Sequence, residues 1–285
     1  MRSLDKDFWR FDEVFSDVKL LTLVETPERM DFFSRQMEEL FGNRIMNDMT
    51  PLDAMGIKPH ITCINPRNDV YLDNLCNKDR GWMCRNNELG CAEEHYRLVK
   101  TSLLGSNDKH LDGSKGVLIF EDDIRFIKDA DLIRRVMENI PDDWDILMFG
   151  AFTVSPDIKC SLDEKAVNDY WSEMESLNLW NCSMYALSKE GMKYYVAFQD
   201  NHFRVADSPL NHAPSLIEKY NWPMKAYITR FPVVIQEDKD VFVSTVRGLD
   251  PNDLDGIDYK NDNTYERGID KSRYYAVSDF IPEED

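Results

Sequence analysis

The sequence lacks an apolar run long enough to cross a membrane, and residues 1–7 lack the apolar core of a signal peptide. It also lacks a long basic stripe, since 34 lysines and arginines stand against 53 aspartates and glutamates, a formal net charge of −19. Such a charge repels nucleic-acid phosphates and anionic membranes. We therefore expect a cytoplasmic protein with no membrane insertion and no nucleic-acid partner.

The six cysteines form no Cys-x-x-Cys pair and show no zinc-finger spacing. For an intracellular chain this pattern favours buried, reduced thiols over disulfides. A hydrophobic content of 42% and an aromatic content of 12% are those of a globular protein.

Apolar strand-like runs alternate with helical patterns along most of the chain. Strands are expected at 18–24, 117–120, 144–150 and 183–187, and helices at 26–41, 87–105, 129–139 and 189–200. This alternation predicts a single α/β domain, residues 1–247, in which helices flank a mainly parallel, mixed sheet. Residues 43–86 show weak periodicity and are either a binding loop or irregular structure. Residues 248–285 are acidic and are expected to form a C-terminal tail or surface extension.

Residues 117–123 read Val-Leu-Ile-Phe-Glu-Asp-Asp, a buried-strand pattern that runs into three acids. Ligands of such sheets gather beyond the carboxyl ends of the strands. Because side chains alternate along a strand, we expect Glu121 and Asp123 on one side and Asp122 on the other. Paired hard oxygen donors predict a Mg²⁺ or Mn²⁺ site that takes further ligands from substrate phosphates. The alternative is a solvated acidic turn, or neutralisation of one carboxylate by Arg125.

Four blocks of sequence carry recognisable motifs. They are 87–95 (Asn-Glu-Leu-Gly-Cys-Ala-Glu-Glu-His), 118–123 (Leu-Ile-Phe-Glu-Asp-Asp), 141–147 (Pro-Asp-Asp-Trp-Asp-Ile-Leu) and 184–191 (Met-Tyr-Ala-Leu-Ser-Lys-Glu-Gly). Together they resemble glycosyltransferase family 25, which includes bacterial lipooligosaccharide sugar transferases and collagen galactosyltransferases. Glu94 stands where that family has a serine.

The resemblance implies a GT-A-type, Rossmann-like fold and a hexosyltransferase that uses Mn²⁺ or Mg²⁺ and a nucleotide sugar, a UDP-sugar. The acceptor is then a glycan or a protein-linked hydroxyl group, and the anomeric carbon is inverted. By analogy Asp123 binds the metal, and Glu121 assists the metal or the donor ribose.

Five more positions are candidates for the same site. Asp122 and His95 are expected near the donor, and Glu25 and Arg29, which follow the first strand, at the nucleotide or its phosphates. Asp207 matches a family aspartate and is the candidate general base, although Asp207-Ser208-Pro209 is also a good helix start. His95 is alternatively a hydrogen-bonded packing residue.

Two other classes of function fit the acids at the strand end. A metal-dependent phosphoesterase also places paired acids there, and a catalytically silent scaffold can retain the fold. The strongly negative charge argues against a nucleic-acid substrate for the phosphoesterase.

Overall fold

The computed structural model describes residues 11–21, 27–41, 86–105, 116–150, 152–153, 162–174, 179–180, 182–202, 206–236 and 270–280. The predictions for Glu25, for residues 43–85 and for residues 248–269 lie outside these ranges. Within them, no helix combines the length and the apolar character that a membrane crossing requires.

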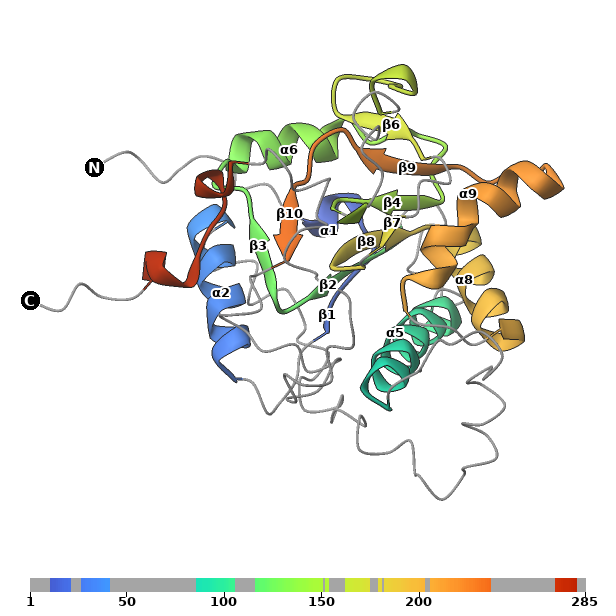
Figure 1. Cartoon of the computed structure of the whole chain (residues 1–285), viewed down its shortest axis with the longest axis horizontal. Coiled ribbons are helices and arrows are strands. Elements are labelled where there is room, and N and C mark those ends of the chain that lie inside the picture. The colour runs from blue at the N-terminus through green and yellow to red at the C-terminus, as the bar shows by residue number, and fades with distance from the viewer. Residues whose placement is uncertain are drawn as a thin grey trace, which may run out of the picture.

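Six strands form the central sheet, in the order β1-β2-β8-β4-β9-β6 (Figure 1). They are β1 (Asp17–Leu21), β2 (Val117–Glu121), β8 (Met184–Leu187), β4 (Ile146–Met148), β9 (Ala226–Thr229) and β6 (Trp171–Glu173). β1, β2, β4 and β9 run in one direction, and β8 and β6 run against them. The predicted α/β fold with a mainly parallel, mixed sheet is therefore confirmed.

Two small antiparallel pairs accompany the central sheet. β3 (Ile124–Phe126) pairs with β10 (Val234–Gln236), and β5 (Phe152–Thr153) pairs with β7 (Leu179–Trp180). Because β3 follows β2 after a two-residue turn, β10 is brought next to the acidic end of β2.

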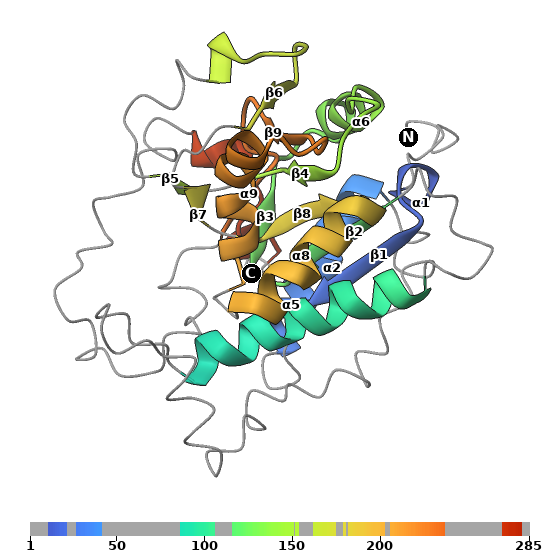
Figure 2. The ribbon, with the colours of Figure 1, turned by 90° about the vertical axis from the view of Figure 1, so that its right-hand side faces the viewer.

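Helices cover both faces of the sheet. α1 (Phe11–Val14), α2 (Pro27–Phe41) and α6 (Ala130–Glu138) contribute to one core, and α5 (Asn86–Gly105), α8 (Lys189–His202) and α9 (Ser208–Tyr220) to the other. Figure 2 shows α5 and α8 side by side over one face. These α5 and α8 bounds agree closely with the predicted helices.

The two cores explain why the strands are apolar on both faces. Along β2, Leu118 and Phe120 join the core beneath α2, whereas Val117 and Ile119 join the core beneath α5 and α8. All four side chains are at most 1% exposed. The sheet is thus sandwiched between helices, and its strand ends are where polar residues gather.

The described part of the C-terminal extension lies against α2 and β3. It contains two short 3₁₀ helices, η4 (Lys271–Arg273) and η5 (Val277–Phe280). Tyr274 is 4% exposed and donates a hydrogen bond of 2.7 Å from its hydroxyl group to the Pro232 carbonyl. Phe280 packs edge-on against Phe32 of α2. This part of the extension therefore belongs to the packed structure.

Candidate functional site at the end of strand β2

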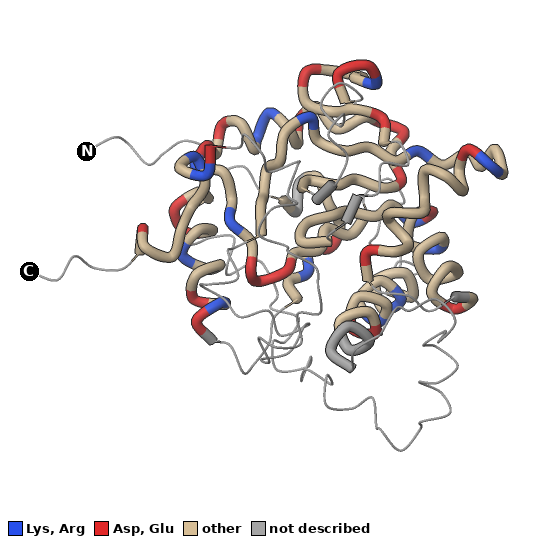
Figure 3. Tube along the Cα trace, in the orientation of Figure 1, with Lys and Arg blue, Asp and Glu red and all other residues tan. Residues whose placement is uncertain are grey.

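The three acids lie where β2 ends and turns into β3 (Figure 3). Glu121 is the last residue of β2, and Asp122 and Asp123 form the turn. The expected alternation assumed that all three acids belong to the strand, but the strand stops at Glu121. Asp122 and Asp123 instead share one cationic neighbour.

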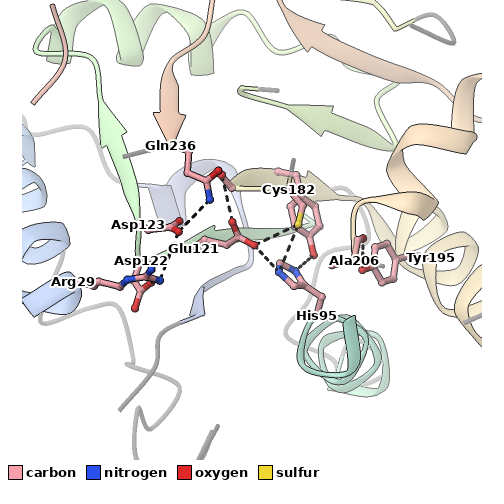
Figure 4. Close-up of polar contacts among 11 residues, drawn as sticks. Arg29, His95, Glu121, Asp122, Asp123, Cys182, Tyr195, Ala206 and Gln236 are labelled. Atoms are coloured by element: carbon pink, nitrogen blue, oxygen red, sulfur yellow. Dashed lines mark hydrogen bonds and ion pairs between the residues drawn. The ribbon is translucent and has the colours of Figure 1, made fainter. Parts of the chain in front are cut away.

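That neighbour is Arg29, in the first turn of α2. Its Nη1 atom lies 3.4 Å from Asp122 Oδ1 and 3.6 Å from Asp123 Oδ2 (Figure 4). Arg29 and Asp122 are both nearly inaccessible, so water screens their attraction weakly. The guanidinium group of Arg125 hydrogen-bonds to the carbonyls of Tyr275 and Lys271 in the C-terminal extension. Arg29 therefore neutralises acidic charge at this turn, the role considered for Arg125.

Asp123 is the acid with a carboxylate oxygen that could bind a cation. Gln236 of β10 donates a hydrogen bond of 3.1 Å to its Oδ2 atom, while Oδ1 is buried and accepts no hydrogen bond from the described residues. Burial and the negative charges of Glu121 and Asp122 raise the pKa of Asp123 to about 7, against the opposing effects of Arg29 and Gln236. The positive charge of Arg29 thus does not fully compensate the ionised carboxylate of Asp123.

Glu121 has a different set of partners. His95 Nε2 lies 3.1 Å from Glu121 Oε1, the Cys182 thiol 3.4 Å from the same oxygen, and the Ser183 hydroxyl 3.3 Å from Oε2. Burial raises the pKa of Glu121, but the hydrogen bond and charge of His95, with the Cys182 and Ser183 contacts, outweigh it and lower that pKa overall. Glu121 is therefore ionised when Asp123 begins to titrate.

His95 connects Glu121 to the interior of the protein. It projects from α5, is fully buried, and places Nδ1 2.9 Å from the Tyr185 hydroxyl oxygen. Cys91 lies one helical turn earlier on α5, and the ligand atoms of Cys91, His95 and Glu121 all lie within 4.8 Å of one another. His95 thus lies beside the acidic turn, with Glu121 as its bonded acid, and its place near the donor stays a prediction.

Asp207 directly precedes α9 but makes no capping hydrogen bond with its side chain. Burial raises the pKa of the Cys182 thiol well above its usual range, and the charges of Glu121, Cys91 and Asp207 add to this increase. The charge of Asp207 therefore acts on the same thiol that contacts Glu121. Its role as general base stays a prediction, and Glu25 lies outside the described residues.

Sequence reasoning missed Cys91 and Cys182 as members of this site. Cys91 and His95 are four residues apart, which places them on one helix face, and that spacing was the available signal. Cys182 and Ser183 reach Glu121 because β8 runs antiparallel to β2, so its first residues lie at the end of β2. No local pattern indicates that pairing.

A scan of the chain against protein-family models found no matching family, and a search of curated proteins found no matching relative. The site has two parts that share Glu121 as a neighbour. One part is the hard oxygen donor Asp123, and the other is the softer group of the Cys182 thiol and the His95 imidazole, which contact Glu121.

Proposed function

We propose that the protein is a metal-dependent glycosyltransferase that moves a hexose from a UDP-sugar to a hydroxyl group of a glycan or protein-linked acceptor, with inversion. The motifs at 87–95 and 118–123 suggest this reaction class, and the α/β fold accommodates it. The observation that carries the proposal is Asp123, a buried carboxylate at the end of a central strand with one oxygen that accepts no hydrogen bond from the described residues.

A divalent cation fits this position. Mg²⁺ and Mn²⁺ prefer carboxylate oxygens and leave several positions for water and substrate phosphates. Burial and like charge disfavour ionised Asp123, and a cation reverses that preference. Asp123 would hold the ion with Glu121 beside it. When bound, such an ion neutralises the charge that develops on a departing diphosphate.

The chain's own residues have separate tasks in this proposal. Arg29 holds Asp122 and orients the turn, and Gln236 fixes the second oxygen of Asp123 so that Oδ1 keeps its direction. Asp207 is the candidate to accept the proton of the acceptor hydroxyl group. Although Asp207 stands at the N-cap position of α9, its side chain makes no capping hydrogen bond.

Substitution of Asp123 by Asn tests the proposal, because it removes the charge and preserves the shape. UDP release from a panel of UDP-hexoses with Mn²⁺ should fall by roughly 100-fold or more in Asp123→Asn. Asp131→Asn, at an exposed acid on α6, is the matched control and should keep full turnover. Turnover by Asp123→Asn at the wild-type rate would contradict the metal assignment.

The same panel separates the other function classes. Thermal shifts with Mn²⁺ plus UDP, CDP or GDP should show stabilisation by UDP only when the metal is present. Hydrolysis of phosphate esters without sugar transfer would indicate a phosphoesterase. Stabilisation by none of the nucleotides would indicate a scaffold.

A further inference from the structure

A group of soft ligand atoms lies beside Glu121, on the side opposite Arg29 (Figure 4). Three atoms form a close triangle: His95 Nε2 is 3.1 Å from Glu121 Oε1, Cys182 Sγ is 3.4 Å from that oxygen, and Cys182 Sγ is 3.7 Å from His95 Nε2. The ligand atom of Cys91 lies within 4.8 Å of those of His95 and Glu121.

This triangle has the size of one face of a tetrahedral zinc site. With ordinary zinc bond lengths to nitrogen, oxygen and sulfur, the nitrogen–oxygen edge is about 3.3 Å and each edge to sulfur about 3.6 Å. The observed edges of 3.1, 3.4 and 3.7 Å differ from these by a few tenths of an ångström. An ion could therefore bind these three atoms with only small side-chain movements.

The surroundings of His95 are those of a metal-binding histidine. Zinc-bound imidazoles usually engage their second nitrogen in a hydrogen bond, which fixes the ring orientation. In this protein Nδ1 lies 2.9 Å from the Tyr185 hydroxyl oxygen, and the two rings stack at 5.7 Å. This arrangement turns Nε2 toward Glu121 and Cys182.

The ligands also come from well-supported elements. Cys91 and His95 occupy one face of α5, Glu121 ends β2, and Cys182 immediately precedes β8, which pairs with β2. His95 and Cys182 are buried, whereas Cys91 is only partly buried, so an ion can approach from its side. A Mg²⁺ or Mn²⁺ site would use oxygen ligands, and packing of the helix on the sheet would not need two thiols near this imidazole.

We propose that Cys91, His95, Glu121 and Cys182 form a binding site for a zinc-class ion. If Cys91 moves in as the fourth ligand beside the triangle of His95, Glu121 and Cys182, the coordination shell is closed, so the ion stabilises the structure and has no open position for a substrate. Binding displaces the protons of the two thiols to solvent, leaving thiolate ligands. The ion joins α5 to the ends of β2 and β8 and fixes Glu121 next to the acidic turn. The site does not depend on the transferase proposal.

Metal content and cobalt substitution test the site in the full-length, untagged chain. Protein produced with zinc and purified without chelator should contain about one zinc ion per chain by plasma mass spectrometry. After exchange with Co²⁺, a near-ultraviolet thiolate-to-cobalt charge-transfer band should appear together with visible bands of tetrahedral cobalt. A folded wild-type chain that gives neither zinc nor the charge-transfer band overturns the proposal.

Variants assign the ligands. Cys91→Ser combined with Cys182→Ser should abolish the charge-transfer band, while His212→Gln, at an exposed histidine stacked on Phe198, should retain the band and the zinc. Tyr185→Phe should bind zinc roughly 10- to 100-fold more weakly, a loss that a packing role would not cause. Full zinc content in the double cysteine variant would place the ion elsewhere and refute the site.

One further variant separates this proposal from the transferase. Asp123→Asn should lose turnover and keep its zinc, because Asp123 belongs to the other half of the site. Loss of zinc in Asp123→Asn, with the fold retained by circular dichroism, would also refute the ligand set.

Discussion

Asp123 is the carboxyl group of the acidic turn whose ionised form is disfavoured by its surroundings. Arg29 and Gln236 favour its ionised form, but burial and the charges of Glu121 and Asp122 prevail. In the unfolded chain the same group has a pKa near 3.8, so between 3.8 and about 7 the folded chain holds a proton that the unfolded chain has lost. The contribution of Asp123 to stability therefore decreases as the pH rises through that window.

Asp123→Asn should consequently stabilise the metal-free protein more at about pH 8 than at about pH 5. We expect a gain of roughly 2 kcal/mol at the higher pH, or about 5 °C in melting temperature, and a much smaller gain at the lower pH. Thermal unfolding in chelator at both pH values measures the difference. An equal gain at both pH values would mean that Asp123 is already ionised at the lower one.

At the scale of single residues the sequence pointed to the acids, because an apolar strand that runs into three carboxylates is a local pattern, and the motif at 87–95 pointed to His95. It did not identify Arg29 as the partner of Asp122, since that contact joins α2 to the β2–β3 turn. Nor did it show that β2 ends at Glu121, so that Asp122 and Asp123 form a turn, because the end of a strand depends on its neighbours in the sheet.

The start of helix α8 packs closely against the backbone at Asp145, just before β4. Ser188 precedes α8, accepts a hydrogen bond of 3.2 Å from the Gly191 amide and donates one of 2.6 Å to Asp145 Oδ1. A Cβ atom on Gly191 would lie 2.1 Å from the Asp145 carbonyl oxygen. Such a contact with backbone can be relieved only if α8 moves away from the strand that follows Asp145.

Gly191→Ala should therefore destabilise the protein by more than about 2 kcal/mol, because it overpacks a backbone contact. Gly105→Ala is the matched control: nothing lies within 4 Å of its added Cβ atom, at the last residue of α5. Since alanine is the better helix former, the control should be neutral or more stable by up to about 1 kcal/mol. Urea unfolding gives both values, and equal midpoints for the two variants would contradict the close fit at Gly191.

Elements with local end signals were predicted well. Asp129 accepts a hydrogen bond of 2.9 Å from the Leu132 amide and begins α6 as the sequence indicates. The strand order has no such local signal: β9 lies between β4 and the edge strand β6. Pro232 falls after β9 has ended, and strand order depends on pairings between distant segments.

The whole molecule is held together by contacts across long sequence separations. Arg125 reaches carbonyl groups of the C-terminal extension, and Tyr274 of that extension joins the core beneath α2. The composition predicts an acidic, globular α/β protein but not these contacts, because they depend on how distant segments pack. The large negative charge also explains why an anionic nucleotide would need a cation at the site.

Calorimetric titration of UDP, with and without Mn²⁺, decides whether a cation at Asp123 recruits a nucleotide diphosphate. UDP should bind the wild-type chain only when Mn²⁺ is present, and Asp123→Asn should weaken that binding by at least about tenfold. Below about pH 7 the affinity should also decrease, because protons compete with the metal for Asp123. Equal UDP binding without metal, or unchanged binding by Asp123→Asn, would contradict the proposed role of this carboxylate.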